Sequence, residues 1–257
     1  MAALLSAVVA RGVEIIAHRG ASHDAPENTV AALRLGYAQG ADAGELDVHL
    51  SRDGQLVVIH DADTQRVGGQ PQAVADQTLD ELRTLDVGQW GPWKGSAFSE
   101  KIPLLADILA LVPPGKRLFI EVKTHAEAVP ELERVLQAAG LGARQLPLIT
   151  FDLETAKSLK LRLPAHEVCW IVDFSATKPP AITDLITTAK SAGLDGLDLN
   201  HRFPIDAAFV DAVHAAGLKL YTWTVDDADV ARKLGAAGVD GITTNRPGWM
   251  REQLGSR

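Results

Sequence analysis

Cysteine is almost absent from this sequence, since Cys169 stands alone among 257 residues. A single thiol excludes an intrachain disulfide, so no disulfide framework holds the fold together. Because a lone cysteine in an apolar run usually acts as a small hydrophobic side chain, we expect Cys169 to fill space inside a strand. Long apolar runs are also missing: no stretch approaches the ~18 residues that a membrane-spanning helix needs.

The chain has no excess of positive charge. Its 25 lysines and arginines are outnumbered by 33 aspartates and glutamates, which gives a formal net charge of −8. This balance argues against broad binding to nucleic acid or anionic lipid, which needs a cationic face. A small anionic substrate is still allowed, because two or three local cations can hold one phosphate. We therefore expect no nucleic-acid partner and no stable membrane association, and the oligomeric state stays open.

The N-terminus lacks the features of a secretory signal. Residues 2–10 are mostly apolar, but no lysine or arginine precedes them. We interpret residues 1–12 as a short N-terminal extension, with secretion as the alternative. The prediction is a soluble, cytoplasmic protein with a single catalytic domain over residues 13–257.

One pattern recurs along the chain: a helical run ends in glycine, and a short apolar run follows. Glycine just past a helix end takes a left-handed conformation that would strain other residues. Strands that alternate with helices of about 10–15 residues imply βαβ units and a parallel sheet. The pattern predicts eight strands, at Val13–His18, Glu45–Leu50, Arg117–Lys123, Leu146–Thr150, Glu167–Val172, Gly196–Asn200, Lys219–Val225 and Gly241–Thr244.

Eight such units favour a (β/α)8 TIM barrel, a fold that typically takes ~250 residues. No Gly-rich dinucleotide-binding or Walker motif follows the first strand, which weakens the alternative of an open doubly wound sheet. The predicted helices are Asn28–Gln39, Leu104–Val112, Ala126–Ala139, Asp152–Leu161, Pro180–Ala192, Asp206–Ala216 and Asp227–Leu234.

The interval between Leu50 and Arg117 is too long for one crossover helix. Residues Gln55–His60 are expected to form a strand that pairs back on the second one. Residues 61–101, rich in glycine and tryptophan, are then expected to form a small insertion over one end of the barrel.

Polar side chains stand at the end of the first strand and along the second, and barrel active sites lie at the carboxyl ends of the strands. His18 and Arg19 follow the first strand. Glu45 and Asp47 are two residues apart on the second strand, so they share one face. Two buried carboxylates repel each other, and a hard divalent cation such as Mg²⁺ or Ca²⁺ would relieve that repulsion. The alternative is a solvated outer face of an edge strand.

Further candidates continue this polar group. Glu121 and Lys123 alternate on the third strand; Glu121 could join the two acidic residues, or form a buried pair with Lys123. His60, beside Asp61, could pair with a first-strand histidine as general acid and base. The alternative is a hydrogen-bonded surface histidine. His201, after the sixth strand, is a weaker candidate for the mouth of the barrel.

Taken in order, these residues resemble the glycerophosphodiester phosphodiesterases of the bacterial, cytosolic type. The resemblance runs from Val13 to Pro247, and each fragment is weak alone, whereas the ordered set is specific. The matching segments are Ala17–Ser22, Ala25–Thr29, Glu45–Val48, Val58–Asp61, Glu121–Lys123, Tyr221–Val225 and Gly238–Pro247.

The resemblance implies a TIM barrel with a small insertion that hydrolyses glycerophosphodiesters to sn-glycerol 3-phosphate and an alcohol. It implies one divalent cation, Ca²⁺ or Mg²⁺, held by Glu45, Asp47 and Glu121. His18 and His60 would be the general acid and base, without a decision about which is which.

The resemblance also implies substrate-binding residues. Arg19 and Lys123 would contact the phosphate, and Trp223 would pack against the glycerol or the leaving group. Glu27 would orient the first-strand loop through Arg19. One departure is Gly44, where many relatives have a branched apolar residue, and we expect it to loosen local packing.

The sequence leaves two other functions open. A lysophospholipase D-like or phospholipase C-like phosphodiesterase would need an apolar ramp near its site, which only Trp90, Trp93 and Phe98 could supply. A barrel that binds glycerophosphodiesters without cleaving them should have lost a histidine or a carboxylate, and none is missing.

Overall fold

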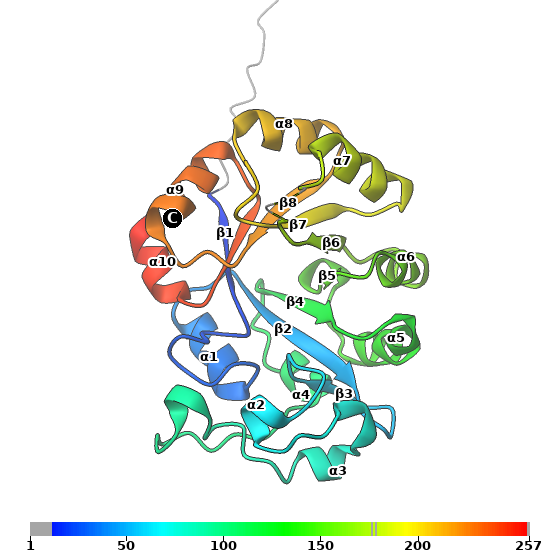
Figure 1. Ribbon diagram of the computed structural model, residues 1–257, viewed down its shortest axis with the longest axis vertical. Coiled ribbons are helices and arrows are strands. Elements are labelled where there is room, and N and C mark those ends of the chain that lie inside the picture. The colour runs from blue at the N-terminus through cyan, green and yellow to red at the C-terminus, as the bar shows by residue number, and fades with distance from the viewer. Residues whose placement is uncertain (1–11, 176, 178, 256–257) are drawn as a thin grey trace, which may run out of the picture.

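The computed structural model describes residues 12–175, 177 and 179–255 of the chain. Most of the predicted N-terminal extension therefore lies outside the described residues. Eight parallel strands close into a barrel, because the first strand pairs with both the second and the last. The TIM-barrel prediction is confirmed (Figure 1). The barrel strands are β1 (Glu14–Ala17), β2 (Ala43–Leu50), β4 (Arg117–Val122), β5 (Leu148–Thr150), β6 (Val168–Val172), β7 (Gly196–Asn200), β8 (Lys219–Trp223) and β9 (Gly241–Thr244).

Helices alternate with these strands around the outside of the barrel (Figure 1). Several begin at a side chain that accepts a hydrogen bond from the first turn, as Asp152 and Asp227 do. No helix in the described ranges is long and apolar enough to cross a membrane. The helices are α1 (Val30–Ala38), α4 (Leu105–Leu109), α5 (Val129–Ala138), α6 (Leu153–Arg162), α7 (Ile182–Ser191), α8 (Ala207–Ala215), α9 (Ala228–Ala237) and α10 (Pro247–Leu254).

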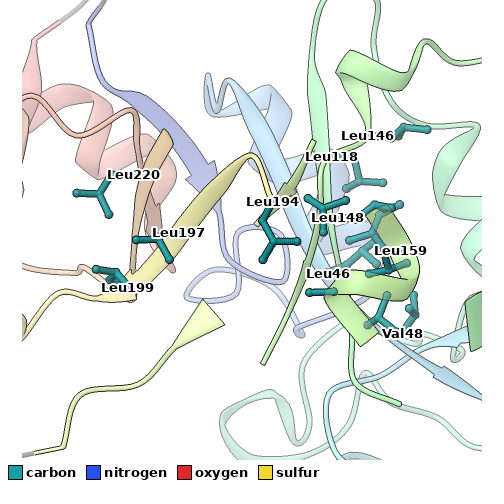
Figure 2. Close-up of a cluster of buried hydrophobic side chains, with 14 of the residues drawn as sticks. Leu46, Val48, Leu118, Leu146, Leu148, Leu159, Leu194, Leu197, Leu199 and Leu220 are labelled. Carbon is teal, nitrogen blue, oxygen red and sulfur yellow. The ribbon is translucent and has the colours of Figure 1, made fainter. Parts of the chain in front are cut away.

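The main hydrophobic core lies between the strands and the surrounding helices. Figure 2 shows part of it, with Leu46 and Val48 of β2, Leu118 of β4 and Leu159 of α6 among its members. A smaller cluster fills the inside of the barrel and includes the fully buried Cys169, as the sequence predicted. Both sides of the sheet are therefore packed, which leaves polar residues mainly at the strand ends.

An insertion follows the second barrel strand. β3 (Leu56–Val58) pairs antiparallel with β2, as predicted, and Val58 lies opposite Val48. The next elements are α2 (Gln65–Gly68), a 3₁₀ turn (Val74–Asp76), α3 (Leu79–Leu82) and a second turn (Gly91–Trp93). The first three of these elements share a separate apolar cluster with β3. In Figure 1, α2 and α3 lie beside β2 and β3.

Two glycines allow close packing against α1. Gly20 has a φ of +81°, and a Cβ atom there would lie 2.4 Å from the carbonyl carbon of Ala32. The missing side chain at Gly20 therefore lets the loop after β1 lie directly against the helix. At Gly44, a Cβ atom would lie 2.4 Å from Cδ1 of Leu33. The expectation that Gly44 loosens packing is therefore wrong, because Leu33 fills the space that a side chain would take.

Candidate active site

A cleft of about 470 Å³ opens at the carboxyl ends of the barrel strands. Of the predicted site residues, Asp47 and Glu27 are not among those that line it. Asp47 is held in the buried layer behind the cleft, and Glu27 contacts Arg19. The lining residues are His18, Arg19, Glu45, His60, Glu121, Lys123, Ile149, Phe151, Ile171, Asp198, Trp223, Thr224 and Thr243.

Three carboxylates form an acidic cluster at the cleft. Glu45, Asp47 and Glu121 each offer an oxygen, and these oxygens lie within 4.8 Å of one another. Asp47 and Glu121 are direct neighbours across the β2–β4 ladder. All three residues are buried, so the alternative of a solvated edge face is wrong. Oδ1 of Asp47 has no hydrogen-bond partner among the described residues, which fits an oxygen-only site for a divalent cation.

Burial and mutual repulsion shift the acidity of this cluster. Burial and the charges of Asp47 and Glu121 raise the pKa of Glu45 well above its ordinary value. Burial and Asp47 also raise the pKa of Glu121 to about 7. Although burial opposes it, the cations of Arg19 and Lys123 lower the pKa of Asp47. The cluster therefore holds protons near neutrality in the absence of a metal ion, and a divalent cation would compete with them.

Two cationic side chains flank the acidic cluster. Nε of Arg19 lies 3.2 Å from Oδ2 of Asp47. Nζ of Lys123 donates to Oε1 of Glu121 at 2.8 Å and lies 3.7 Å from Oδ1 of Asp47. Glu121 therefore belongs to the acidic cluster and also forms the buried pair with Lys123 that was the alternative. Because both cations also line the cleft, they could contact a bound anion.

His18 is held in one tautomer by a residue from the other end of the chain. Its Nδ1 lies 2.7 Å from Oδ1 of Asn245, so the ring donates through Nδ1. Asn245 is fixed in turn by Asp226, which accepts from its Nδ2 at 2.5 Å and from its backbone N at 2.8 Å. Burial, followed by the charge of Arg19, lowers the pKa of His18 to about 4. His18 is therefore neutral at pH 7, with Nε2 as an acceptor.

His60 is held by a different kind of partner. Its Nδ1 lies 2.6 Å from Oδ1 of Asp61, and its Nε2 lies 3.2 Å from Nζ of Lys123. Hydrogen bonds from Arg66 lower the pKa of Asp61 to about 2, although burial opposes them, so Asp61 is ionised. Because a carboxylate only accepts and an ammonium group only donates, Nδ1 of His60 donates to Asp61 and its Nε2 accepts from Lys123. His60 is hydrogen-bonded and partly exposed, as the alternative of a surface histidine expects, but it also lines the cleft.

Arg66, which the sequence did not single out, joins several of these groups. From α2 it donates to both oxygens of Asp61, at 2.6 and 3.1 Å, and to both oxygens of Glu27, at 3.0 and 2.8 Å. Glu27 accepts from Arg19 at 2.9 Å, as expected. Arg66 thus links Glu27, from the loop after β1, to Asp61, which lies beside His60.

Asn28 is a second residue whose role the sequence did not reveal. Its Nδ2 donates to Oδ2 of Asp47 at 2.8 Å, and its Oδ1 accepts from the backbone N of Asp47 at 3.2 Å. Asn28 has a φ of +58°, and Arg19 has a φ of +53°. Asparagine tolerates this left-handed region better than most residues, whereas arginine does so at a cost. Strain therefore falls on the loop that carries the site.

Aromatic residues form one wall of the cleft. Trp223 lies at the end of β8, and its ring packs edge-on against Phe151 with centroids 5.5 Å apart. His201 is not among the lining residues; its Nδ1 lies 3.3 Å from the carbonyl oxygen of Trp223. The aromatic residues of the insertion do not line the cleft either: Trp90 packs under Arg66, and Trp93 packs against Phe98.

Solved structures share this architecture. A phosphodiesterase from Oleispira antarctica, in complex with the product sn-glycerol-3-phosphate, aligns with a TM-score of 0.82 at 29% identity, over 95% of this chain and 97% of that one. A glycerophosphodiester phosphodiesterase from Agrobacterium tumefaciens aligns with a TM-score of 0.77 at 27% identity, over 93% and 99%. The fold and these likenesses define a TIM-barrel phosphodiesterase.

The sequence comparisons give the family. Residues 18–249 match the model of the glycerophosphoryl diester phosphodiesterase family. A glycerophosphodiester phosphodiesterase from Caldanaerobacter subterraneus subsp. tengcongensis is 31% identical over 91% of this chain and 94% of its own length. The chain belongs to the glycerophosphoryl diester phosphodiesterase family, and it is a phosphoric diester hydrolase of that class.

Proposed function

We propose that this protein hydrolyses glycerophosphodiesters to sn-glycerol 3-phosphate and an alcohol, with one divalent cation and two histidines. The observation that carries the proposal is the joint presence of the acidic cluster, His18, His60 and two cations in one cleft. A phosphodiester anion repels nucleophiles, so its charge must be neutralised before attack. A cation held by Glu45, Asp47 and Glu121 would neutralise a phosphate oxygen and stabilise charge in the transition state.

The protein's own cations would position the same phosphate. Arg19 can offer a planar pair of donors, whereas Lys123 offers a compact point charge. Both are paired with carboxylates of the acidic cluster in the structure. Cation binding to those carboxylates would free donors of Arg19 and Lys123 for the substrate.

The hydrogen bonds of the two histidines support a different role for each. Neutral His18 would accept a proton on Nε2 from the nucleophile, which is water or the neighbouring glycerol hydroxyl, because Nδ1 is already committed to Asn245. Nε2 of His60 accepts from Lys123 in the structure; once Lys123 turns to the substrate, Nε2 would be free to carry the proton that the leaving alkoxide receives, while Asp61 holds Nδ1. Each ring keeps its orientation through its Nδ1 partner.

Contacts between the insertion and the site support a single-domain organisation. We infer that residues 13–257 act as one catalytic domain, with the insertion at about 61–101 as part of it. Arg66 from the insertion bonds to Glu27 and Asp61, so the insertion cannot move far without disturbing the site. Cytoplasmic location and a free small-molecule substrate remain part of this proposal.

The experiment is release of sn-glycerol 3-phosphate from glycerophosphocholine by metal-free protein, with Mg²⁺ or Ca²⁺ then restored. We expect loss of activity in EDTA and recovery with one ion. His18→Asn and His60→Asn should each lower kcat by roughly 100-fold or more. The pH–rate profile of the unmodified protein should be bell-shaped.

Each part of the proposal can fail separately. Release that is indifferent to EDTA would contradict the metal requirement alone. A flat profile between pH 5 and 9, or full activity in both histidine variants, would contradict the acid–base roles. No release with either ion would contradict the reaction itself.

A further inference from the structure

Asp198 is an acidic residue of the cleft that the proposed mechanism does not use. It lies on β7, with 3% of its surface exposed, and it lines the cleft. Its Oδ1 is buried without a hydrogen-bond partner, and no described cation lies within ion-pair distance of its carboxyl group. It also stands outside the acidic cluster of Glu45, Asp47 and Glu121.

The fold itself does not require a carboxyl group at this position. The neighbours of Asp198 in the ladder are Ile171 of β6 and Tyr221 of β8, and both belong to the hydrophobic cluster inside the barrel. A buried polar group without a partner costs free energy, so an apolar side chain would serve packing better here. A ligand that enters the cleft could supply the missing partner.

The protonation state of the Asp198 carboxyl group limits which ligand groups could bind to it. Burial, with repulsion from Glu121, raises the pKa of Asp198 to about 8, so the group is mostly a neutral acid at pH 7. A neutral carboxyl group both donates and accepts, as a hydroxyl group does. Arg19 and Lys123, the cations that suit a phosphate, pair with Asp47 and Glu121 and not with Asp198.

We propose that Asp198 binds a hydroxyl group of the substrate's glycerol moiety and thereby selects glycerophosphodiesters among phosphodiesters. The inference rests on the proposed function and adds a specificity residue to it. Ile149, Ile171 and Trp223 line the same cleft and offer apolar surface to the carbon atoms of glycerol. Trp223 is also tied to this strand, because its Nε1 donates to the carbonyl oxygen of Asp198 at 3.2 Å.

The first test compares two substrates of the metal-loaded enzyme: glycerophosphocholine, and bis(p-nitrophenyl) phosphate, which has no glycerol. Asp198→Ala should lower kcat/KM for glycerophosphocholine roughly 10- to 100-fold and leave the second substrate within about twofold. Asp198→Asn should recover part of the loss, because the amide still donates and accepts. Equal losses on both substrates would overturn the proposal.

The matched control is Asn200→Ala on the same strand. Nδ2 of Asn200 donates to Oδ1 of Asp173 at 2.8 Å, and Asn200 is not among the residues that line the cleft. This variant should leave both substrates unchanged. If Asn200→Ala reproduces the selective loss of Asp198→Ala, the effect belongs to the strand and the proposal is wrong.

A binding measurement separates this inference from the proposed function. Calorimetry should show that Asp198→Ala weakens sn-glycerol 3-phosphate roughly 10-fold or more and leaves inorganic phosphate unchanged. Normal binding of sn-glycerol 3-phosphate by this variant would overturn the inference while the proposed reaction stands. Failure of the unmodified protein to bind or release sn-glycerol 3-phosphate would contradict the proposed function instead.

A further comparison identifies the part of the substrate that Asp198 contacts. If Asp198 contacts the ammonium group of choline, Asp198→Asn should be as poor as Asp198→Ala, and both should cleave glycerophosphoglycerol normally. That outcome would overturn the proposal. The melting temperature of Asp198→Ala should equal or exceed that of the unmodified protein, which confirms that lost activity is not lost folding.

Discussion

A buried carboxyl group makes stability depend on pH, and Asp198 gives the clearest case. Its pKa rises from 3.8 to about 8 on folding, through burial and repulsion from Glu121. Between those values the folded state keeps a proton that the unfolded state has lost. The unfolded state then binds fewer protons, so stability falls as pH rises.

Asp198→Asn should remove this dependence. Between pH 6 and pH 8, the free energy of unfolding of the unmodified protein should fall by about 2 kcal/mol relative to the variant, since one pKa unit corresponds to about 1.4 kcal/mol. Chemical unfolding of both metal-free proteins in EDTA measures the difference. Parallel pH curves would show that the Asp198 carboxyl group titrates normally.

The sequence reveals some site residues and hides others. Glu45 and Asp47 could be predicted because a spacing of two on a strand places them on one face, and His18 because it follows the first strand. Asn245 and Arg66 could not be predicted. Their roles depend on hydrogen bonds to residues 227 and 39 positions away in the chain, which no local pattern encodes. Asp198 could not be predicted either, because a single acidic residue in a strand shows no spacing pattern of the kind that marks Glu45 and Asp47.

At the scale of elements, the insertion is joined to the barrel site mainly through polar contacts of α2. Arg66 holds Asp61 against His60 and Glu27 against Arg19. Its guanidinium group also lies 4.8 Å above the ring of Trp90, another residue of the insertion. The insertion therefore positions His60 and Arg19 together.

Arg66→Ala should lower kcat/KM for glycerophosphocholine roughly 10- to 100-fold, because both His60 and Arg19 lose the support that orients them. Arg66→Lys, which keeps the charge but not the planar pair of donors, should be intermediate. The control is Arg83→Ala, which removes an exposed pair between Arg83 of the insertion and Asp107 of α4. Activity of Arg66→Ala equal to that of Arg83→Ala would contradict this role.

The elements themselves were largely predictable. The eight strands follow from short apolar runs between helices, and the hairpin strand β3 from the turn that precedes it. The C-terminal helix α10 was not expected, because it has only eight residues, begins with a proline and buries only Pro247 and Met250. Gly44 was misjudged because its environment is set by Leu33, which comes from a different element.

At the scale of the whole molecule, the two ends of the barrel carry different charge networks. Opposite the cleft, Arg117 at the start of β4 binds Glu14 at 2.6 Å and Glu167 at 2.9 Å. Glu167 also accepts from Lys219 at 2.6 Å and from the hydroxyl group of Tyr221 at 2.7 Å. In barrels of this type, the amino-terminal end serves stability and the carboxyl end serves catalysis.

Arg117→Met should therefore lower stability and spare activity. Removing the cation leaves two largely buried carboxylates short of a partner, which should cost roughly 3 kcal/mol. The pair Arg134–Glu131 provides the control, since Arg134 is exposed and Arg134→Met should leave stability essentially unchanged. Denaturant unfolding and kcat/KM at 25 °C would test both statements. A large loss of activity in folded Arg117→Met protein would contradict the division between the two ends.

The central claim is that Glu45, Asp47 and Glu121 bind one divalent cation at the mouth of the barrel. Calorimetric titration of Mg²⁺ or Ca²⁺ into metal-free protein tests it without any assay of activity. We predict one ion per chain, proton release near pH 7 because Glu121 has a pKa of about 7, and at least ~10-fold weaker binding in Glu45→Gln. The exposed Glu154→Gln should bind as the unmodified protein does. Equal titration curves for Glu45→Gln and the unmodified protein, or no binding to either, would contradict the account.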